Sequence, residues 1–194
     1  MKNNFLIIGI PRSGTSSLMK SIASANNLPY VYEPFRFGTT ITNTKNVVIK
    51  TQLHQLDSLI YSGNVTIEHL EKCILFYVEF AKQFDNIVLI NRKDTKSQSE
   101  SLSVHHNGIG EKEKYIYNEQ VYDEKAKILC NNIELLNKYL IKLSEIIKIP
   151  IDTYEDVYYG NGLINKSILF DGEILNLKNK YRQNKAITNE KTLI

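Results

Sequence analysis

Residues 5–18 constrain the fold of this chain more than any other stretch, because they combine an apolar strand, a glycine turn and a helix start. Residues 5–10 are apolar and rich in β-branched side chains, which is typical of a buried parallel strand. Pro11 to Gly14 form a turn, and from Thr15 onward the apolar residues have helical spacing. Such a strand, turn and helix N-terminus cradle a phosphate, because backbone N–H groups and the helix dipole supply positive charge.

The turn nearly satisfies the P-loop pattern of nucleotide hydrolases and kinases. Gly9 and Gly14 have the spacing of that pattern, but Thr15 stands where it requires a lysine that reaches the β- and γ-phosphates. The cation of this turn is Arg12, which lies earlier. A ligand with a shorter phosphate chain and no γ-phosphate would explain the change. A P-loop nucleotide or small-molecule kinase is therefore kept as an alternative.

The run PRSGTSS, which begins at Pro11, resembles the 5′-phosphosulfate loop of sulfotransferases that use 3′-phosphoadenosine 5′-phosphosulfate (PAPS). The family pattern is P-[KR]-S-G-[TS]-[TS]. The resemblance implies that the 5′-phosphosulfate is held by Arg12, Ser13, Gly14, Thr15 and Ser16. The alternative is an ordinary glycine turn before a helix, because short motifs also occur by chance.

Composition and charge agree with one globular domain that binds an anion. A chain of 194 residues with 42% hydrophobic and 23% charged residues is long enough for a single α/β domain spanning 1–194. Its formal net charge of +3 suits an anionic ligand but is too weak to indicate nucleic acid. Cys73 and Cys130 are expected to be buried reduced thiols, and the spacing of His and Cys indicates no metal site. We expect no signal peptide or transmembrane anchor, and hence a cytoplasmic protein.

Glu33 follows a predicted strand at residues 28–32 and precedes Pro34, which we expect to hold it extended at the strand end. Ligands of parallel sheets lie beyond the carboxyl ends of the strands, so Glu33 should lie near the phosphate-binding turn. The run Tyr32-Glu33-Pro34 resembles a segment of carbohydrate sulfotransferases, which implies that Glu33 is the base that deprotonates the acceptor hydroxyl. The alternative is a surface glutamate that caps the following segment or pairs with Arg36.

A predicted third strand at residues 46–50 leads into the sequence KTQL, which is similar to the K-T-H-L segment of cytosolic sulfotransferases. The histidine of that segment is the base, and Gln52, which replaces it here, cannot accept a proton at neutral pH. His54 is an alternative base, although we favour a surface histidine at the start of the next helix. Lys50, at the strand end, is a candidate to stabilise charge on the transferring sulfuryl group. The alternative is a solvated lysine.

A second motif, R-K-D-x-x-x-Q-x-x-S-L, begins at Arg92, directly after a predicted buried strand. It resembles the R-R-D-x-x-x-Q-x-x-S-L segment of bacterial glycolipid sulfotransferases, which implies that Arg92, Lys93 and Ser101 hold the 3′-phosphate of PAPS. Which of the two cations contacts that phosphate stays open. Asp94 or Thr95 is expected to cap the following helix. The alternative is a basic loop between a strand and a helix.

The remaining elements are predicted from periodicity and breakers: a helix at 66–84 capped by Thr66, a buried strand at 86–91, a helix at 117–147 and a short strand at 151–154. The sequence YED at the end of this last strand resembles a structural segment of the sulfotransferases. The resemblance also implies that a basic C-terminal segment folds back over the nucleotide, so Lys180 or Arg182 is a candidate to reach the 3′-phosphate or to stack on adenine. The alternative is a frayed basic tail.

These motifs occur in the order found in the PAPS-dependent sulfotransferase family. The expected fold is a P-loop-type, doubly wound parallel sheet of about four or five strands flanked by helices. The resemblance implies in-line transfer of a sulfuryl group from PAPS to a hydroxyl of a small-molecule, carbohydrate or glycolipid acceptor, without a metal. Glu33 takes the acceptor proton, and Lys50 or Arg12 offsets charge on the bridging oxygen. Besides the kinase, a non-catalytic nucleotide-binding relative is an alternative.

Overall fold

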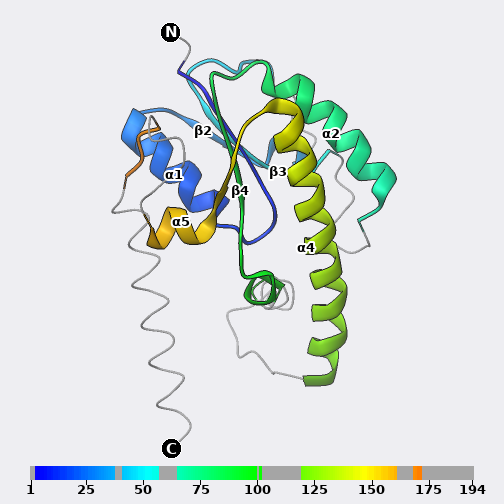
Figure 1. The fold of residues 1–194 in the computed structure, drawn as a ribbon. Helices are drawn as coiled ribbons and strands as arrows, with labels where there is room; N and C mark the ends of the chain where they lie inside the picture. The colour runs from blue at the N-terminus through cyan, green and yellow to red at the C-terminus, as the bar shows by residue number, and fades with distance from the viewer. Residues whose placement is uncertain are drawn as a thin grey trace, which may run out of the picture.

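Five parallel strands form a single sheet in the computed structural model of the chain. The structure describes residues 3–37, 41–56, 65–99, 101, 119–160 and 168–171, with the main chain alone at residue 37 and over 119–130. The strands are β1 (Phe5–Gly9), β2 (Tyr30–Tyr32), β3 (Val48–Gln52), β4 (Asn86–Asn91) and β5 (Ile151–Thr153), in the order β2-β3-β1-β4-β5. β1 pairs with β3 on one side and with β4 on the other, so it lies at the centre of the sheet (Figure 1).

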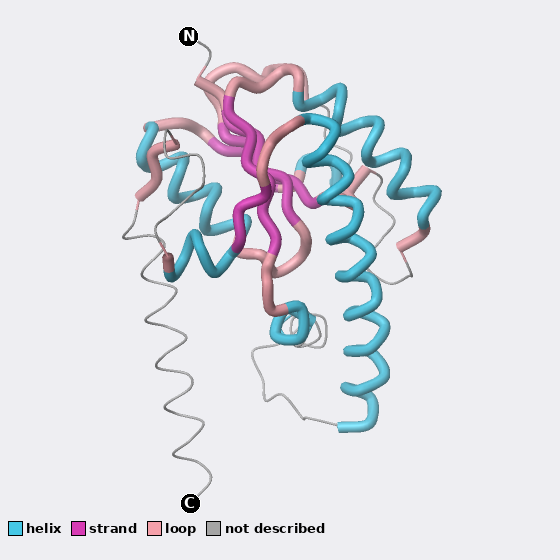
Figure 2. The backbone as a smooth tube through the Cα atoms, in the orientation of Figure 1, coloured by secondary structure: helices cyan, strands magenta, loops and turns pink. Residues whose placement is uncertain are grey.

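Helices cover both faces of this sheet (Figure 2). One face carries α1 (Thr15–Asn26) and α5 (Tyr154–Tyr159), and the other carries α2 (Ile67–Ala81) and α4 (Glu119–Ile147). A short 3-10 helix, η1 (Pro34–Phe37), follows β2, and residues 95–99 are helical after β4. The doubly wound α/β fold expected from the sequence is therefore confirmed.

The side chains of β1 divide between the two faces, as the alternation of a strand requires. Ile7 packs with Leu18 of α1, whereas Leu6 packs on the opposite face with Tyr77 of α2 and Leu140 of α4. Because β1 is buried on both faces, its sequence is continuously apolar rather than alternating. This burial fixes the carboxyl end of β1, and with it the start of the turn that follows.

Local capping agrees with the sequence-based predictions. Thr66 caps α2, although that helix ends at Ala81 rather than at residue 84. The carboxylate of Asp94 caps the helical residues 95–99 by accepting an amide hydrogen bond of 2.9 Å from Ser97. The helix after the second motif therefore begins where its sequence indicates.

Two local predictions are wrong. Pro34 does not hold Glu33 extended: the backbone of Glu33 has a φ of 45°, because the chain turns sharply from β2 into η1. β3 continues to Gln52, so Lys50 lies inside the strand rather than at its end. Lys50 is 1% exposed and is therefore not the solvated lysine that the alternative interpretation required.

Some predictions fall outside the described residues, namely those for Lys180, Arg182 and the side chain of Cys130. Cys73 is buried, as expected. In the described part of the chain, no helix has the length and apolar character needed to cross a membrane. Over the same residues, no three His, Cys, Asp or Glu side chains gather as metal ligands. The single-domain division stays a prediction.

Candidate functional site

Gly14 ends the turn after β1 and begins α1 in a left-handed conformation, with a φ of 81°. A Cβ atom at this position would lie 2.6 Å from Cε2 of Tyr158 and 2.8 Å from Cδ2 of Tyr154, both on α5. The Tyr158 hydroxyl also donates a hydrogen bond of 2.7 Å to the carbonyl oxygen of Gly14. Glycine is therefore required here both by the backbone angle and by the tyrosine wall, Tyr154 and Tyr158, behind the turn.

The other residues of the predicted phosphosulfate loop serve the turn in different ways. Ser13 is buried, and its Oγ donates a hydrogen bond of 2.7 Å to the carbonyl oxygen of Ile10, so its side chain closes the turn. The first amides of a helix, here those of Thr15 and Ser16, have no intrahelical carbonyl to bind. An anion at the start of α1 would receive these amides together with the positive end of the helix dipole.

The second predicted phosphate site lies directly beside the first. Arg12 Nε donates a hydrogen bond of 2.9 Å to Ser101 Oγ, and the buried side chain of Gln98 donates from Nε2 to the carbonyl oxygen of Pro11. Arg12 has a φ of 65°, which is uncommon for a residue other than glycine. The turn after β1 and the helical segment after β4 therefore meet at the carboxyl edge of two neighbouring strands, where parallel sheets bind ligands.

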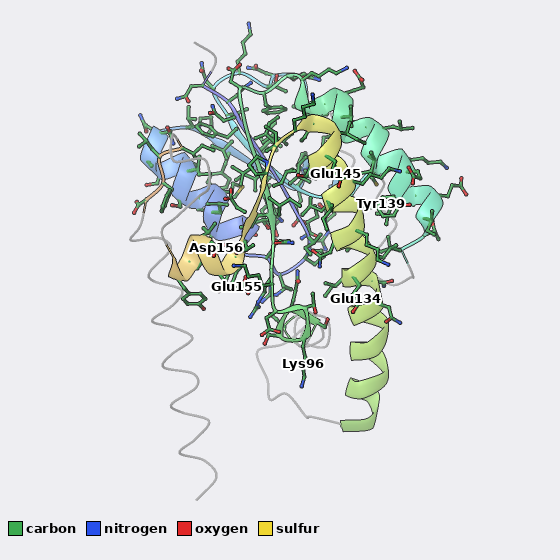
Figure 3. All side chains as sticks on the ribbon, viewed as in Figure 1. Lys96, Glu134, Tyr139, Glu145, Glu155 and Asp156 are labelled. Atoms are coloured by element: carbon green, nitrogen blue, oxygen red, sulfur yellow. The ribbon has the colours of Figure 1, made fainter. Side chains whose placement is uncertain are left out.

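The two cations after β4 are paired with acidic residues of α5. Arg92 Nε lies 3.7 Å from Glu155 Oε1, and the Arg92 guanidinium lies 5.0 Å from the centre of the Tyr154 ring. Lys93 Nζ lies 3.0 Å from Asp156 Oδ1, and the Lys93 amide donates to Glu155 Oε2 at 3.0 Å. Figure 3 labels Glu155 and Asp156 on α5, beside the segment that leaves β4. A phosphate bound here would share these cations with the two carboxylates.

Glu33 is fully buried, and each of its carboxylate oxygens accepts hydrogen bonds from two side chains. Oε1 accepts from Lys50 Nζ and, at 3.0 Å, from Gln52 Nε2. Oε2 accepts from Gln55 Nε2 at 3.0 Å and from Arg36 Nη1 at 3.3 Å. The alternative of a surface glutamate is therefore wrong, although the pairing with Arg36 that it included is present.

The neighbours of Glu33 set its protonation. Burial alone would raise the pKa of the Glu33 carboxyl, but the charge and hydrogen bond of Lys50, with hydrogen bonds from Gln55 and Tyr32, outweigh burial and lower that pKa. Burial raises the pKa of the Tyr32 phenol, and the side chain of Ser16 on α1 lowers it in part. The ring of Tyr32 lies 4.5 Å from Lys50 Nζ. Tyr32 therefore lies between the start of α1 and the candidate base.

His54 is buried, with 4% of its surface exposed, so the prediction of a surface histidine is wrong. Desolvation lowers the pKa of His54 to about 4, and its imidazole is neutral at pH 7. Its carbonyl oxygen lies 2.7 Å from Nε2 of His69 on α2, which fixes the chain after β3 against that helix. A role for His54 as an alternative base stays a prediction.

Three side chains of this region were missed by sequence reasoning: Gln55, Tyr32 and Gln98. Gln98 is the glutamine of the second motif, so its spacing to Ser101 was a usable signal. Tyr32 likewise belongs to the Tyr32-Glu33-Pro34 run, whereas Gln55 carries no comparable signal. The contact of Gln55 with Glu33 depends on how the turn after β3 packs against the end of β2.

Comparisons with known proteins do not identify a family. No family model matches the chain, and no curated protein matches it. Among solved structures, the chain is similar to the crystal structure of a gluconokinase from Sinorhizobium meliloti 1021, with 12% sequence identity and a TM-score of 0.28. The match covers 75% of this chain and 95% of that chain. A similarity at this level carries no argument about fold or activity.

Proposed function

We propose that this chain binds PAPS at the carboxyl edge of its sheet and transfers the sulfuryl group to a hydroxyl of a small-molecule, carbohydrate or glycolipid acceptor. The contact between Arg12 and Ser101 carries the proposal. These residues come from the two motifs that resemble the 5′-phosphosulfate and 3′-phosphate sites of the sulfotransferase family. A nucleotide with anionic groups on both its 3′ and 5′ positions suits two cation- and hydroxyl-bearing loops that touch.

In this proposal the 5′-phosphosulfate binds the amides of Thr15 and Ser16 and the guanidinium of Arg12. The 3′-phosphate binds Ser101 and one of the two cations after β4, Arg92 or Lys93. Glu155 and Asp156 compete with a bound ligand for these cations. A doubly charged phosphate attracts the cations strongly enough to compete with the two carboxylates, whereas a neutral group does not. The second phosphate is thus what distinguishes PAPS from AMP and ATP.

In the proposed sulfuryl transfer, the buried pair of Glu33 and Lys50 provides the general base and a cation beside it. Glu33 is a carboxylate at neutral pH because its pKa is lowered, so it is able to accept the proton of the acceptor hydroxyl. Lys50 or Arg12 offsets the charge that develops on the bridging oxygen as the sulfuryl group leaves. Tyr32 supports the pairing of the two sites, because it contacts both Ser16 and Glu33.

The main alternative is a P-loop nucleotide or small-molecule kinase. The strand, turn and helix at residues 5–26 suit a kinase as well as a sulfotransferase. Thr15 argues against the kinase, because a P-loop needs a lysine at that position to reach the β- and γ-phosphates. A non-catalytic nucleotide-binding relative would keep the same turn and lose transfer.

Calorimetry with adenosine 3′,5′-bisphosphate (PAP), AMP and ATP tests the proposal, together with turnover of radiolabelled PAPS over a panel of hydroxyl acceptors. We expect PAP to bind at least about tenfold more tightly than AMP, which corresponds to about 1.4 kcal/mol. Equal affinity for PAP and AMP overturns the proposal. Mg²⁺-dependent ATP turnover decides for the kinase, and tight PAP binding with no turnover of any acceptor decides for the binding module.

A further inference from the structure

The carboxylate of Glu33 has its hydrogen-bonding positions filled by the protein itself. A carboxylate offers about four lone-pair sites. Side chains of Lys50, Gln52, Gln55 and Arg36 occupy two on each oxygen, and the Tyr32 hydroxyl adds a further interaction. An acceptor hydroxyl that delivers its proton to Glu33 therefore needs one of these donors to move away.

Three of the four side-chain donors are held in place. Lys50 is a buried cation, and separating it from Glu33 would leave two unpaired buried charges. Gln52 and Gln55 are buried and are joined by two hydrogen bonds. The backbone N–H of Gln52 donates to the side-chain Oε1 of Gln55 at 3.2 Å, and the backbone N–H of Gln55 donates to the backbone carbonyl oxygen of Gln52 at 2.9 Å. Withdrawal of either glutamine would leave buried polar groups without their hydrogen bonds.

Arg36 differs from the other three donors in position and exposure. Its side chain is 35% exposed, and its hydrogen bond to Glu33 Oε2, at 3.3 Å, is longer than those of Gln52 and Gln55. It projects from η1, a single 3-10 turn, and its guanidinium reaches solvent, whereas the side chains of Lys50, Gln52 and Gln55 are buried. Arg36 is therefore the donor that leaves Glu33 at the lowest free-energy cost.

We propose that the acceptor hydroxyl reaches Glu33 on the Oε2 side by displacing Arg36, while Gln55 acts as a positioning residue that holds the carboxylate. This inference rests on the proposed sulfuryl transfer. The acceptor O–H proton passes to Oε2, and the acceptor oxygen forms a bond to the sulfur of PAPS. The bond from sulfur to the bridging phosphate oxygen breaks, and its electron pair leaves with PAP. Gln55 keeps Oε2 pointed at the incoming hydroxyl throughout.

The test compares Arg36→Gln and Gln55→Met in the full chain, with Lys82→Gln as the matched control. Lys82 forms an exposed ion pair with Glu79 at the same i,i+3 spacing, at the C-terminal end of α2. We expect Arg36→Gln to raise kcat/KM for the acceptor by about two- to fivefold, because the ion pair between Arg36 and Glu33 no longer has to be broken. We expect Gln55→Met to lower kcat at least about tenfold with PAP affinity retained, because a hydrogen bond to a buried charge is lost.

A second measurement separates positioning from simple packing. In chains carrying ¹³C-labelled glutamate, the Glu33 carboxyl resonance is identified by its absence in Glu33→Gln. Both Arg36→Gln and Gln55→Met remove a donor that favours the carboxylate, so this resonance should titrate at higher pH in each than in the wild type. The acid limb of the kcat profile should move in the same direction. Thermal unfolding checks each variant, and Gln55→Asn, which keeps the amide but shortens its reach, replaces Gln55→Met if the latter does not fold.

The outcomes distinguish this inference from the function on which it rests. Wild-type chain that turns over no PAPS with any acceptor overturns both. Wild-type turnover combined with an Arg36→Gln value of kcat/KM at or below that of the wild type overturns the displacement of Arg36 alone. An unchanged Glu33 titration in Gln55→Met overturns the positioning role of Gln55.

Discussion

Arg12 and Ser101 lie 89 positions apart in the sequence and are joined by a hydrogen bond of 2.9 Å between Nε and Oγ. The contact is exposed, so its net contribution to stability is small. Its geometry instead keeps a guanidinium and a hydroxyl together at the edge of the sheet. An anion that arrives between them offers Arg12 a charged partner in place of a neutral hydroxyl, which adds Coulomb attraction to the hydrogen bond.

The first prediction concerns this contact. Ser101→Ala should weaken PAP binding by about tenfold while AMP binding stays the same, because only PAP carries the 3′-phosphate that Ser101 would contact. Calorimetry with both nucleotides measures the difference. Ser99→Ala is the control, since the Ser99 hydroxyl binds the Thr95 carbonyl oxygen within the same helical segment. A loss of affinity that is equal for PAP and AMP would contradict the placement of Ser101 at a 3′-phosphate.

The second prediction concerns the base. Glu33→Gln should lower sulfuryl transfer by about 10²- to 10⁴-fold, because glutamine preserves the shape of the side chain but cannot accept a proton. PAP affinity should be retained. Radiolabelled PAPS turnover measures the first effect and calorimetry the second.

Stability provides the control for that substitution, because Glu33→Gln leaves the buried Lys50 without a charged partner. Thermal unfolding should therefore show a lower midpoint for Glu33→Gln than for Glu79→Gln, which breaks only an exposed pair. Transfer that persists in folded Glu33→Gln above about a tenth of the wild-type rate would assign the base elsewhere.

The third prediction concerns Gly14. Gly14→Ala should lower the free energy of unfolding by more than about 2 kcal/mol, because the new Cβ meets Tyr158 and Tyr154 at a left-handed backbone angle. Urea unfolding gives the value. In a Tyr158→Leu background the clash is partly relieved, so the same glycine substitution should cost less. An equal loss of unfolding free energy in both backgrounds would show that the clash with Tyr158 does not cause the destabilisation.

The fourth prediction concerns acid stability. The pKa of His54 falls from 6.5 to about 4 on folding, so between these values the unfolded chain binds a proton that the folded chain does not. Stability should therefore fall by about 3 kcal/mol as the pH drops from 6.5 to 4, and change little further through this group. Denaturant unfolding across this range measures the slope, and His54→Gln should flatten it. The lowered pKa of Glu33 adds a separate loss below the ordinary carboxyl range.

The fold follows from local sequence signals to a large extent. The continuous apolar runs of β1 and β4 predict strands buried on both faces, and Thr66 and Asp94 mark helix starts that the structure confirms. The glycine turn and its position after the central strand were also predictable. These features depend on neighbours in the sequence, so the sequence contains them directly.

The candidate site was predicted less completely. Glu33 could be singled out, but its burial, its left-handed backbone and its pairing with Lys50 depend on how β2 and β3 lie side by side. His54 was expected to be a surface histidine at the start of the next helix, but α2 begins only at Ile67 and His54 is buried. Gln55 has no local signal, since only the turn after β3 brings its amide to Glu33. Contacts of this kind arise from tertiary packing, which periodicity does not report.

The contact of the tyrosine wall with Gly14 determines which elements must be in place before the turn after β1 has all its packing contacts. Tyr158 donates to the carbonyl oxygen of Gly14 across 144 positions of sequence, so the phosphate-binding turn is complete only once α5 has docked. A nascent chain that has emerged only as far as β4 carries the whole turn and lacks its backing. In the proposed function, ligand recognition by this edge of the sheet would require that the long helix α4 has already returned the chain to the sheet and placed β5 and α5.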